Sequence, residues 1–372
     1  MSKELVAITV RPGAAMETQS GINNLTPTIY GAFARALTKA CAAIVMHPAS
    51  NFLGHYLLEP LAAAGVSTLG LNSRYVGNDS QLIMERVIQD LGAGVTYLRN
   101  EGYEKILLIG NSGGAALAAF YQAQAEQLTV TATPAGDPVH IAPDDLPPAD
   151  GIILTVAHPG RAQLFAEWLD PSIIDEQDPF ASEPELDMFN AGNGPPFASD
   201  WLTRYRAAQL ERNHRIERWA RSQLKYVRGL PQGVKDMAFI IYRTAADPRH
   251  LDPSIDPNDR PPGETIWGDP RVLNYGANNI GRYTTLTSYL SQWSPSSHAD
   301  GPTNLARTKC PVMALEHTAD ASVVPAMNER WAAAAGNRIS RHEFVGATHY
   351  LKGQPKHLKA TIDSISEFAA GH

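Results

Sequence analysis

The sequence predicts an α/β protein built on a doubly wound, mostly parallel sheet. Short apolar runs alternate with helical patterns through the first third of the chain, and one of these runs, 106–109 (ILLI), is apolar throughout. A wholly apolar run is typical of a strand that is buried on both faces of a parallel sheet. Strands are expected at 42–46, 67–71, 106–109 and 151–157, and helices at 56–64, 80–100 and 115–127. Because strands and helices alternate, we expect parallel pairing.

The same alternation returns near the carboxyl end of the chain. Strands are expected at 311–315 and 339–345, and helices at 327–335 and 357–369. The intervening sequence is rich in Pro, Asp, Trp and Tyr and has few strand-like runs. It is also far longer than an ordinary loop. We therefore expect one α/β core formed by 1–158 and 303–372, interrupted by a mainly helical cap insertion at 159–302.

Composition excludes several classes of protein. The 372-residue chain carries a net charge of -7, whereas nucleic-acid-binding domains are usually basic. No apolar run is long enough to span a bilayer, and the first residues lack the layout of a signal peptide. We expect a soluble cytoplasmic protein without a membrane partner. Cys41 and Cys310 precede apolar runs and are expected to be buried free thiols. No Cys/His cluster predicts a metal site, and no cofactor is expected.

The candidate nucleophile is Ser112, in the run 110–114 (GNSGG). This run matches the pattern G-x-S-x-G. An apolar strand leads directly into it and an alanine-rich helix follows, which is the context of a nucleophile elbow. Side chains at the flanking positions would collide with neighbouring backbone, so glycine is needed there. A serine in a plain glycine-rich turn is the alternative.

A serine hydroxyl needs a base and an orienting acid to become nucleophilic. His349 follows the last predicted strand and precedes the last helix, whereas His357 and His372 lie in or beyond that helix. Asp320 lies in the loop after strand 311–315, and Glu316, at the end of that strand, is its rival. Active sites of open α/β sheets lie at the carboxyl ends of the strands, where these residues are expected to meet.

The oxyanion formed by acyl transfer needs two hydrogen-bond donors. The backbone N–H of Gly113, the residue after the nucleophile, is expected to be one of them. The other is expected from the loop after strand 42–46. Pro48 has no N–H, so Ala49 is the first choice and Ser50 the second.

These segments resemble the α/β-hydrolase superfamily. The resemblance covers 25–158 and 303–370 and rests on AAIVMHPASN, LLIGNSGGAALA, PVMALEHTADASVVP and FVGATHYL. It implies an eight-stranded, mostly parallel sheet with a cap inserted after the sixth strand. The chain order Ser112, Asp320, His349 is the order expected of this superfamily. Many members have His-Gly in the oxyanion loop, whereas this sequence has His47-Pro48, which leaves the second donor open.

The cap sequence carries many aromatic residues and an arginine-rich helix. Most of the aromatic side chains are expected to pack the cap itself, and some to line a pocket. The helix expected at 199–224 includes Arg204 and Arg212, with glutamates interleaved. A solvated face with ion pairs is the favoured interpretation, and a site for an anionic substrate or the phosphates of coenzyme A is the alternative.

The leading hypothesis is a serine hydrolase that cleaves a carboxylic ester of a small to medium organic substrate through an acyl-enzyme. An amide, a thioester or a carbon–carbon bond could be cleaved by the same three residues. A non-catalytic protein that binds a small molecule is the hypothesis from another class. An alanine-rich final helix and exposed strand edges leave a homodimer open.

Overall fold

The core of the protein is an eight-stranded sheet with the order β1-β2-β4-β3-β5-β6-β11-β12. The computed structural model describes residues 3–10 and 27–371. The strands of the sheet are β1 Lys3–Thr9, β2 Thr28–Ala34, β3 Cys41–His47, β4 Ser67–Asn72, β5 Lys105–Asn111, β6 Gly151–Thr155, β11 Val312–His317 and β12 Ile339–Phe344. β2 is antiparallel to both β1 and β4, and every other pairing is parallel. The predicted doubly wound, mostly parallel sheet is confirmed. The antiparallel pairing of β1 with β2 was not predicted.

Helices cover both faces of this sheet, because successive side chains of a strand point to opposite faces. In β5, Leu107 and Ile109 pack in the apolar cluster that includes α1 and α10. Ile106 and Leu108 pack in the opposite cluster, which includes α2, α3, α8 and α9. β5 is therefore buried on both faces, as its apolar sequence predicts. These helices are α1 Leu58–Ala63, α2 Met84–Asn100, α3 Gly114–Glu126, α8 Gly301–Leu305, α9 Pro325–Ala335 and α10 Pro355–Gly371.

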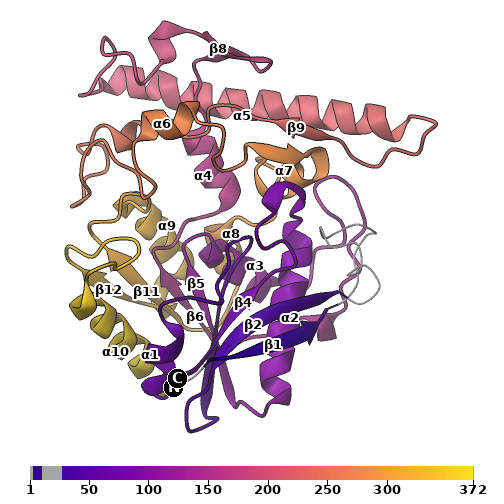
Figure 1. The fold of residues 1–372 in the computed structure, drawn as a ribbon, viewed down its shortest axis with the longest axis vertical. Coiled ribbons are helices and arrows are strands. Elements are labelled where there is room, and N and C mark those ends of the chain that lie inside the picture. The colour runs from indigo at the N-terminus through magenta and orange to yellow at the C-terminus, as the bar shows by residue number, and fades with distance from the viewer. Residues whose placement is uncertain (1–2, 11–26, 372) are drawn as a thin grey trace.

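Residues 161–292, which we call the cap segment, lie above the sheet at the top of Figure 1. The predicted insertion at 159–302 includes this segment. The long helix α5 lies across it, above α4, which leads up from the core. Its elements are α4 Arg161–Trp168, β7 Ile173–Asp175, β8 Asp178–Ser182, α5 Ser199–Arg228, β9 Ala238–Ile240, α6 Pro270–Tyr275, β10 Tyr283–Thr285 and α7 Leu286–Gln292. Short 3-10 helices occur at Asp79–Gln81, Pro143–Asp145, Pro184–Leu186, Pro248–His250 and Gly336–Arg338.

Buried polar contacts join the cap segment to the core. Glu85, fully buried at the start of α2, accepts a hydrogen bond from Ser291 Oγ at 2.7 Å and contacts His298 Nδ1 at 2.9 Å. Gln292 Nε2 donates to the carbonyl of Asp79 at 2.6 Å. A buried carboxylate needs such partners. The end of α7 is therefore held against the amino-terminal end of α2.

The two cysteines and the hydropathy of the helices agree with the composition. Cys41 and Cys310 are buried free thiols, as expected, and burial raises the pKa of each to about 11. Within the described ranges, no helix combines the length and the apolar character needed to cross a bilayer.

The arginine-rich helix α5 is only partly the solvated face that its sequence favours. Arg218 and Glu211 pair at the exposed surface, in line with that interpretation. Arg212 differs, because only 1% of its side chain is exposed. Its guanidinium contacts Glu176 at 2.7 Å and donates to the carbonyl of Asp170 at 2.7 Å. Arg212 therefore holds the segment around β7, from Asp170 to Glu176, against α5 and is not available to bind substrate phosphates.

Replacing Arg212 with alanine is expected to lower the free energy of unfolding by about 3 kcal/mol, because it leaves buried acceptors without a partner. Arg204→Ala is the matched control, since Arg204 is exposed on the same helix. Its effect should stay within about 0.5 kcal/mol. Urea unfolding followed by circular dichroism measures both values. Equal effects for the two variants would contradict the assigned role of Arg212.

Candidate active site

Ser112 lies in a strained turn between β5 and α3. Its backbone φ is 55°, a left-handed conformation that is uncommon for a residue with a side chain. Ser112 N donates to the carbonyl of Thr155 at 3.0 Å, and Ser112 O accepts from Ala115 N at 3.1 Å and from His158 N at 3.3 Å. These bonds join the turn to the ends of β6 and α3. The Ser112 side chain is only partly buried.

Glycine is required on both sides of Ser112 because backbone comes very close. A Cβ on Gly110 would lie 2.6 Å from Ala115 Cα, and one on Gly114 would lie 2.2 Å from the carbonyl oxygen of Met46. Real Cβ atoms do not approach other atoms this closely. The turn thus packs directly against the first turn of α3 and against β3, as the glycine pattern predicted.

Asp320 and His349 are in direct contact. His349 Nδ1 lies 2.7 Å from Asp320 Oδ2, and both side chains are almost fully buried. Asp320 Oδ1 also accepts backbone N–H groups from Ser322 at 2.7 Å and Val323 at 3.1 Å. Burial by itself raises the pKa of the Asp320 carboxyl, but His349 and these N–H groups outweigh it. The net pKa lies below its ordinary value, so the group is ionised at neutral pH.

The structure separates the rival residues from this pair. Glu316 faces Arg341 on β12, with a contact of 2.6 Å, and does not contact His349. His357 lies on α10, where its ring is 6.5 Å from that of Phe344. His372 lies outside the described residues. Asp320 is therefore the carboxylate that orients His349.

Nδ1 of His349 donates to Asp320, so Nε2 is left to act as a base in the neutral ring. No described residue forms a hydrogen bond with the Ser112 hydroxyl. His158 lines the same cavity as Ser112, and its ring centroid lies 6.0 Å from that of His349. Catalytic hydrogen bonds often tighten only when substrate binds. The structure thus brings Asp320 and His349 together, whereas Ser112 forms no hydrogen bond with His349.

His158 is a site residue that sequence reasoning missed. Its Nε2 lies 3.1 Å from Ser322 Oγ, so it supports the loop that holds Asp320. Nδ1 is buried and has no partner among the described residues. Burial, followed by the charge of His349, lowers the pKa of His158 to about 3. The signal in the sequence was its place directly after the apolar run 151–157, at the carboxyl end of a strand.

Of the two predicted oxyanion donors, only the N–H of Gly113 is available in the structure. The N–H of Gly113 meets no acceptor in the described part of the chain, and Gly113 lines the cavity beside Ser112. The N–H of Ala49 instead donates to Nδ1 of His47 at 3.2 Å, and that of Ser50 donates to the same atom at 3.0 Å. Gly113 is free to act as predicted. The expectation for Ala49 needs correction, because its N–H is already used within its own loop.

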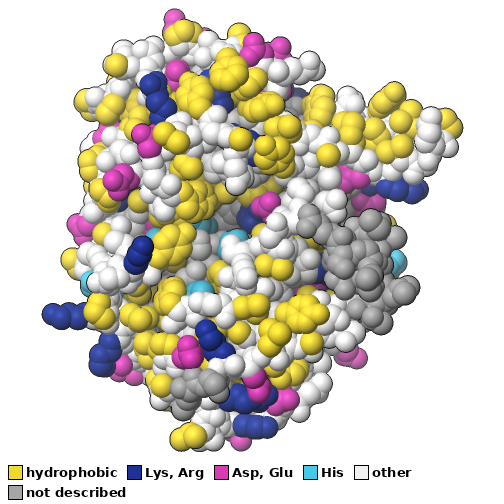
Figure 2. Space-filling view, viewed as in Figure 1, with side chains coloured by type: hydrophobic (Ala, Val, Ile, Leu, Met, Phe, Trp, Pro, Cys, Tyr) yellow, Lys and Arg dark blue, Asp and Glu magenta, His cyan; other side chains and the backbone are white. Residues whose placement is uncertain are grey.

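A cavity of about 370 Å³ opens above Ser112, between the core and the cap segment. A hollow with histidine side chains is visible between these two parts in Figure 2. The cap segment contributes Arg161, Leu164, Trp267 and Ile280 to its wall, and Trp293, directly after the segment, completes it. Arg161 lies 4.1 Å over the ring of Trp293 and pairs with Asp79 of the core. The cavity can take a small to medium molecule with both apolar and polar groups.

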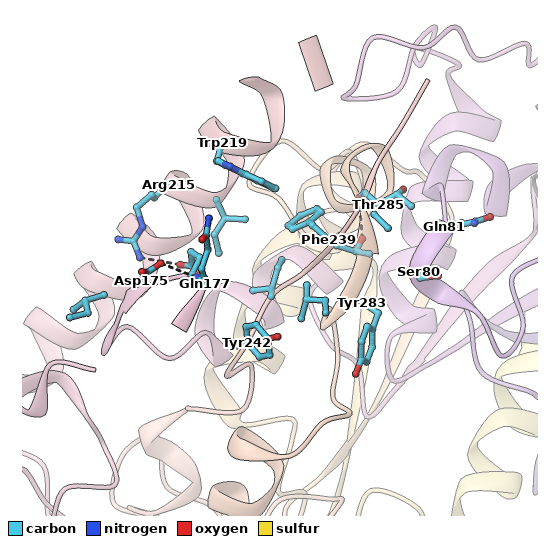
Figure 3. Close-up of a pocket in the computed structure, with 17 residues that line it drawn as sticks. Ser80, Gln81, Asp175, Gln177, Arg215, Trp219, Phe239, Tyr242, Tyr283 and Thr285 are labelled. Carbon is cyan, nitrogen blue, oxygen red and sulfur yellow. Dashed lines mark hydrogen bonds and ion pairs between the residues drawn. The ribbon is translucent and has the colours of Figure 1, made fainter. Parts of the chain in front are cut away.

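A second and larger cavity, of about 970 Å³, is lined mostly by the cap segment, with Ser80 and Gln81 of the core in its wall. Trp219, Phe239 and Tyr283 line it, between α5 and the β9–β10 pair (Figure 3). None of the described residues around it is a histidine or a cysteine. It therefore lacks the histidines found beside Ser112, and the cavity at Ser112 is the candidate active site.

Comparison with solved structures identifies the architecture. The α/β hydrolase GrgF from Penicillium sp. sh18 aligns over 99% of both chains, with a TM-score of 0.53 and 12% sequence identity. DcsB, solved in complex with its substrate analogue, aligns over 99% of this chain and 98% of its own, with a TM-score of 0.51 and 14% identity. No protein-family model and no curated protein matches the sequence. At these identities the likeness establishes the fold, and the protein has the α/β-hydrolase fold.

The buried, neutral His158 should make the protein less stable in acid. Its folded-state pKa of about 3 lies below the ordinary value of 6.5, so between these values the unfolded chain takes up a proton that the folded protein does not. Above pH 6.5 protonation of His158 leaves the free energy of unfolding unchanged. Below pH 6.5 it lowers this free energy by up to about 1.4 kcal/mol per pH unit. We expect His158→Gln to flatten the dependence of the unfolding free energy on pH between 6.5 and 4.

Urea unfolding at several pH values tests this expectation. His214→Gln is the control, because His214 is exposed on α5 and its ring meets solvent in folded and unfolded protein alike. An unchanged slope in His158→Gln would show that His158 takes up its proton equally in the two states.

Proposed function

We propose that the protein is a serine hydrolase that cleaves a carboxylic ester of a small to medium organic substrate through an acyl-enzyme. The observation that carries this proposal is the buried 2.7 Å contact of His349 with Asp320, at the same sheet edge as the strained turn of Ser112. Burying an ionised carboxylate behind a histidine costs free energy, because the carboxylate must be desolvated. Such groups cluster at functional sites. The name of one aligned structure, the α/β hydrolase GrgF, agrees with this class of activity.

The proposed reaction uses each residue in turn. Ser112 Oγ attacks the ester carbonyl while His349 Nε2 takes up its proton, and Asp320 stabilises the imidazolium that forms. The N–H of Gly113 donates to the oxyanion of the tetrahedral intermediate. His349 then protonates the leaving alcohol, and an acyl-enzyme remains on Ser112. Water, activated by the same histidine, attacks the acyl-enzyme and releases the acid.

The size and wall of the cavity favour an uncharged or partly polar ester of limited size as the substrate. Its wall combines Leu164, Ile280 and the two tryptophans with the Arg161–Asp79 ion pair. The triad does not by itself distinguish an ester from an amide, a thioester or a carbon–carbon bond, since the pocket decides this. Burial of Arg212 counts against the coenzyme A thioester alternative, which assigned phosphate binding to α5.

Labelling with a fluorophosphonate probe tests whether Ser112 is an activated nucleophile. We expect peptide mass spectrometry to locate the label on Ser112, and Ser112→Ala to lose it. Turnover of simple aryl esters should fall by at least about a thousandfold in the same variant. A folded wild-type protein that neither labels nor turns over esters would contradict the proposal and favour a binding protein.

Asp320 and Glu316 provide a matched pair for the acid. Asp320→Asn should lower kcat by about ten-thousandfold, because the amide favours the wrong tautomer of His349 and cannot stabilise its charged form. Glu316→Gln removes a carboxylate near the end of β11, the strand that precedes the Asp320 loop. In this variant kcat should stay at the wild-type value. Steady-state kinetics with one aryl ester measures both. A large loss in Glu316→Gln with activity kept in Asp320→Asn would reverse the assignment.

A further inference from the structure

His47 is the last residue of β3 and lines the cavity together with Ser112 and Gly113. Both predicted backbone donors of this loop, the N–H groups of Ala49 and Ser50, are occupied by His47, and Pro48 has no N–H. We propose that the ring Nε2–H of His47 is the second donor to the oxyanion. This inference rests on the proposed serine mechanism and adds a catalytic side chain to it.

The loop after β3 fixes the proton of His47 on the required nitrogen. Nδ1 accepts two N–H groups, at 3.2 Å from Ala49 and 3.0 Å from Ser50. A nitrogen that accepts hydrogen bonds carries no proton, so the neutral ring must carry its proton on Nε2. The loop itself is held by Ser73 Oγ, which donates to the carbonyl of Pro48 at 2.5 Å. The ring is thus prepared as a donor before any substrate binds.

His47 stays neutral over the whole working range of pH. Burial lowers its pKa to about 3, and the charges of Arg161, His158 and His349 act in the same direction. A histidine with so low a pKa is a poor base, so His47 does not compete with His349 for the serine proton. It can still donate a hydrogen bond through Nε2–H. The nearby charge of Arg161 also favours negative charge in this region.

His47 Nε2 lies next to Gly113, the residue that supplies the proposed first donor. A Cβ on Gly113 would lie 2.7 Å from His47 Nε2, which places this atom beside the residue whose N–H is the first donor. No acceptor for Nε2 occurs among the described residues, although the ring lines the cavity. Two donors that converge next to the nucleophile and are fixed before reaction are what stabilisation of an oxyanion requires. The same contact explains why residue 113 is glycine.

Two substitutions separate the donor role from the structural role of His47. In His47→Asn, the side-chain oxygen can replace Nδ1 as the acceptor for Ala49 and Ser50, but the side chain is too short to reach the oxyanion. In His47→Gln, the amide N–H can reach the place of Nε2. We expect kcat for an aryl ester to fall by about a hundredfold to a thousandfold in His47→Asn, with little change in KM, and His47→Gln to recover most of this loss.

A readout apart from turnover follows the ring directly. Nitrogen-15 NMR of the wild-type protein should show His47 protonated at Nε2 and unchanged down to about pH 5. Labelling of Ser112 by a phosphonate should move the Nε2–H proton downfield, because the phosphonyl oxygen occupies the oxyanion position. A proton on Nδ1, or no shift on labelling, would overturn the inference.

The outcomes also distinguish this inference from the proposed function. If Ser112→Ala abolishes turnover but His47→Asn keeps wild-type kcat, the serine mechanism stands and His47 is not a donor. Ester turnover that survives Ser112→Ala would overturn both. Equal losses in His47→Asn and His47→Gln, with KM raised in both, would assign His47 to shaping the pocket and overturn its role as a donor.

Discussion

The backbone of the Ser112 turn packs directly against the end of β3, and the rest of the site depends on this contact. Gly114 lies against the carbonyl of Met46 and Gly113 lies against the ring of His47, so neither position has room for a side chain. The positive φ of Ser112 is maintained because β6 and α3 bond to the same turn. The strain is local and the packing that holds it comes from several elements, which is the arrangement expected where backbone strain persists.

Three histidines at this edge of the sheet differ only in what surrounds them. His349 has an ionised carboxylate behind it, which holds the ring through its Nδ1. His47 faces two backbone donors, and His158 has a hydroxyl on one nitrogen and no described partner on the other, so burial keeps both neutral. The same residue type can therefore take the proposed roles of base, hydrogen-bond donor and support for the Asp320 loop, because the partners of the ring differ at the three positions.

The cap segment forms one wall of the cavity and is joined to the core by polar contacts near the site. Asn258 Nδ2 donates to the carbonyl of Asp320 at 2.9 Å, which links the cap to the loop that carries the acid. Arg161, at the start of α4, pairs with Asp79 of the core. Within the cap, Arg212 fills a buried position that its exposed neighbours on α5 do not share. The cap segment is thus held to the core both at the wall of the cavity and at the loop of Asp320.

The sequence by itself determined the features that depend on local pattern. Apolar runs defined the parallel strands, and the glycines of the run 110–114 indicated a turn too tight for side chains. Positions after strand ends indicated His349, and they indicated Asp320 with Glu316 as its rival. Only the tertiary structure decided which atoms face each other: that Glu316 faces Arg341, that Ala49 donates to His47, and that Arg212 is buried. These outcomes depend on contacts between segments far apart in the chain or on the path of one loop, and neither leaves a periodic signal in the sequence.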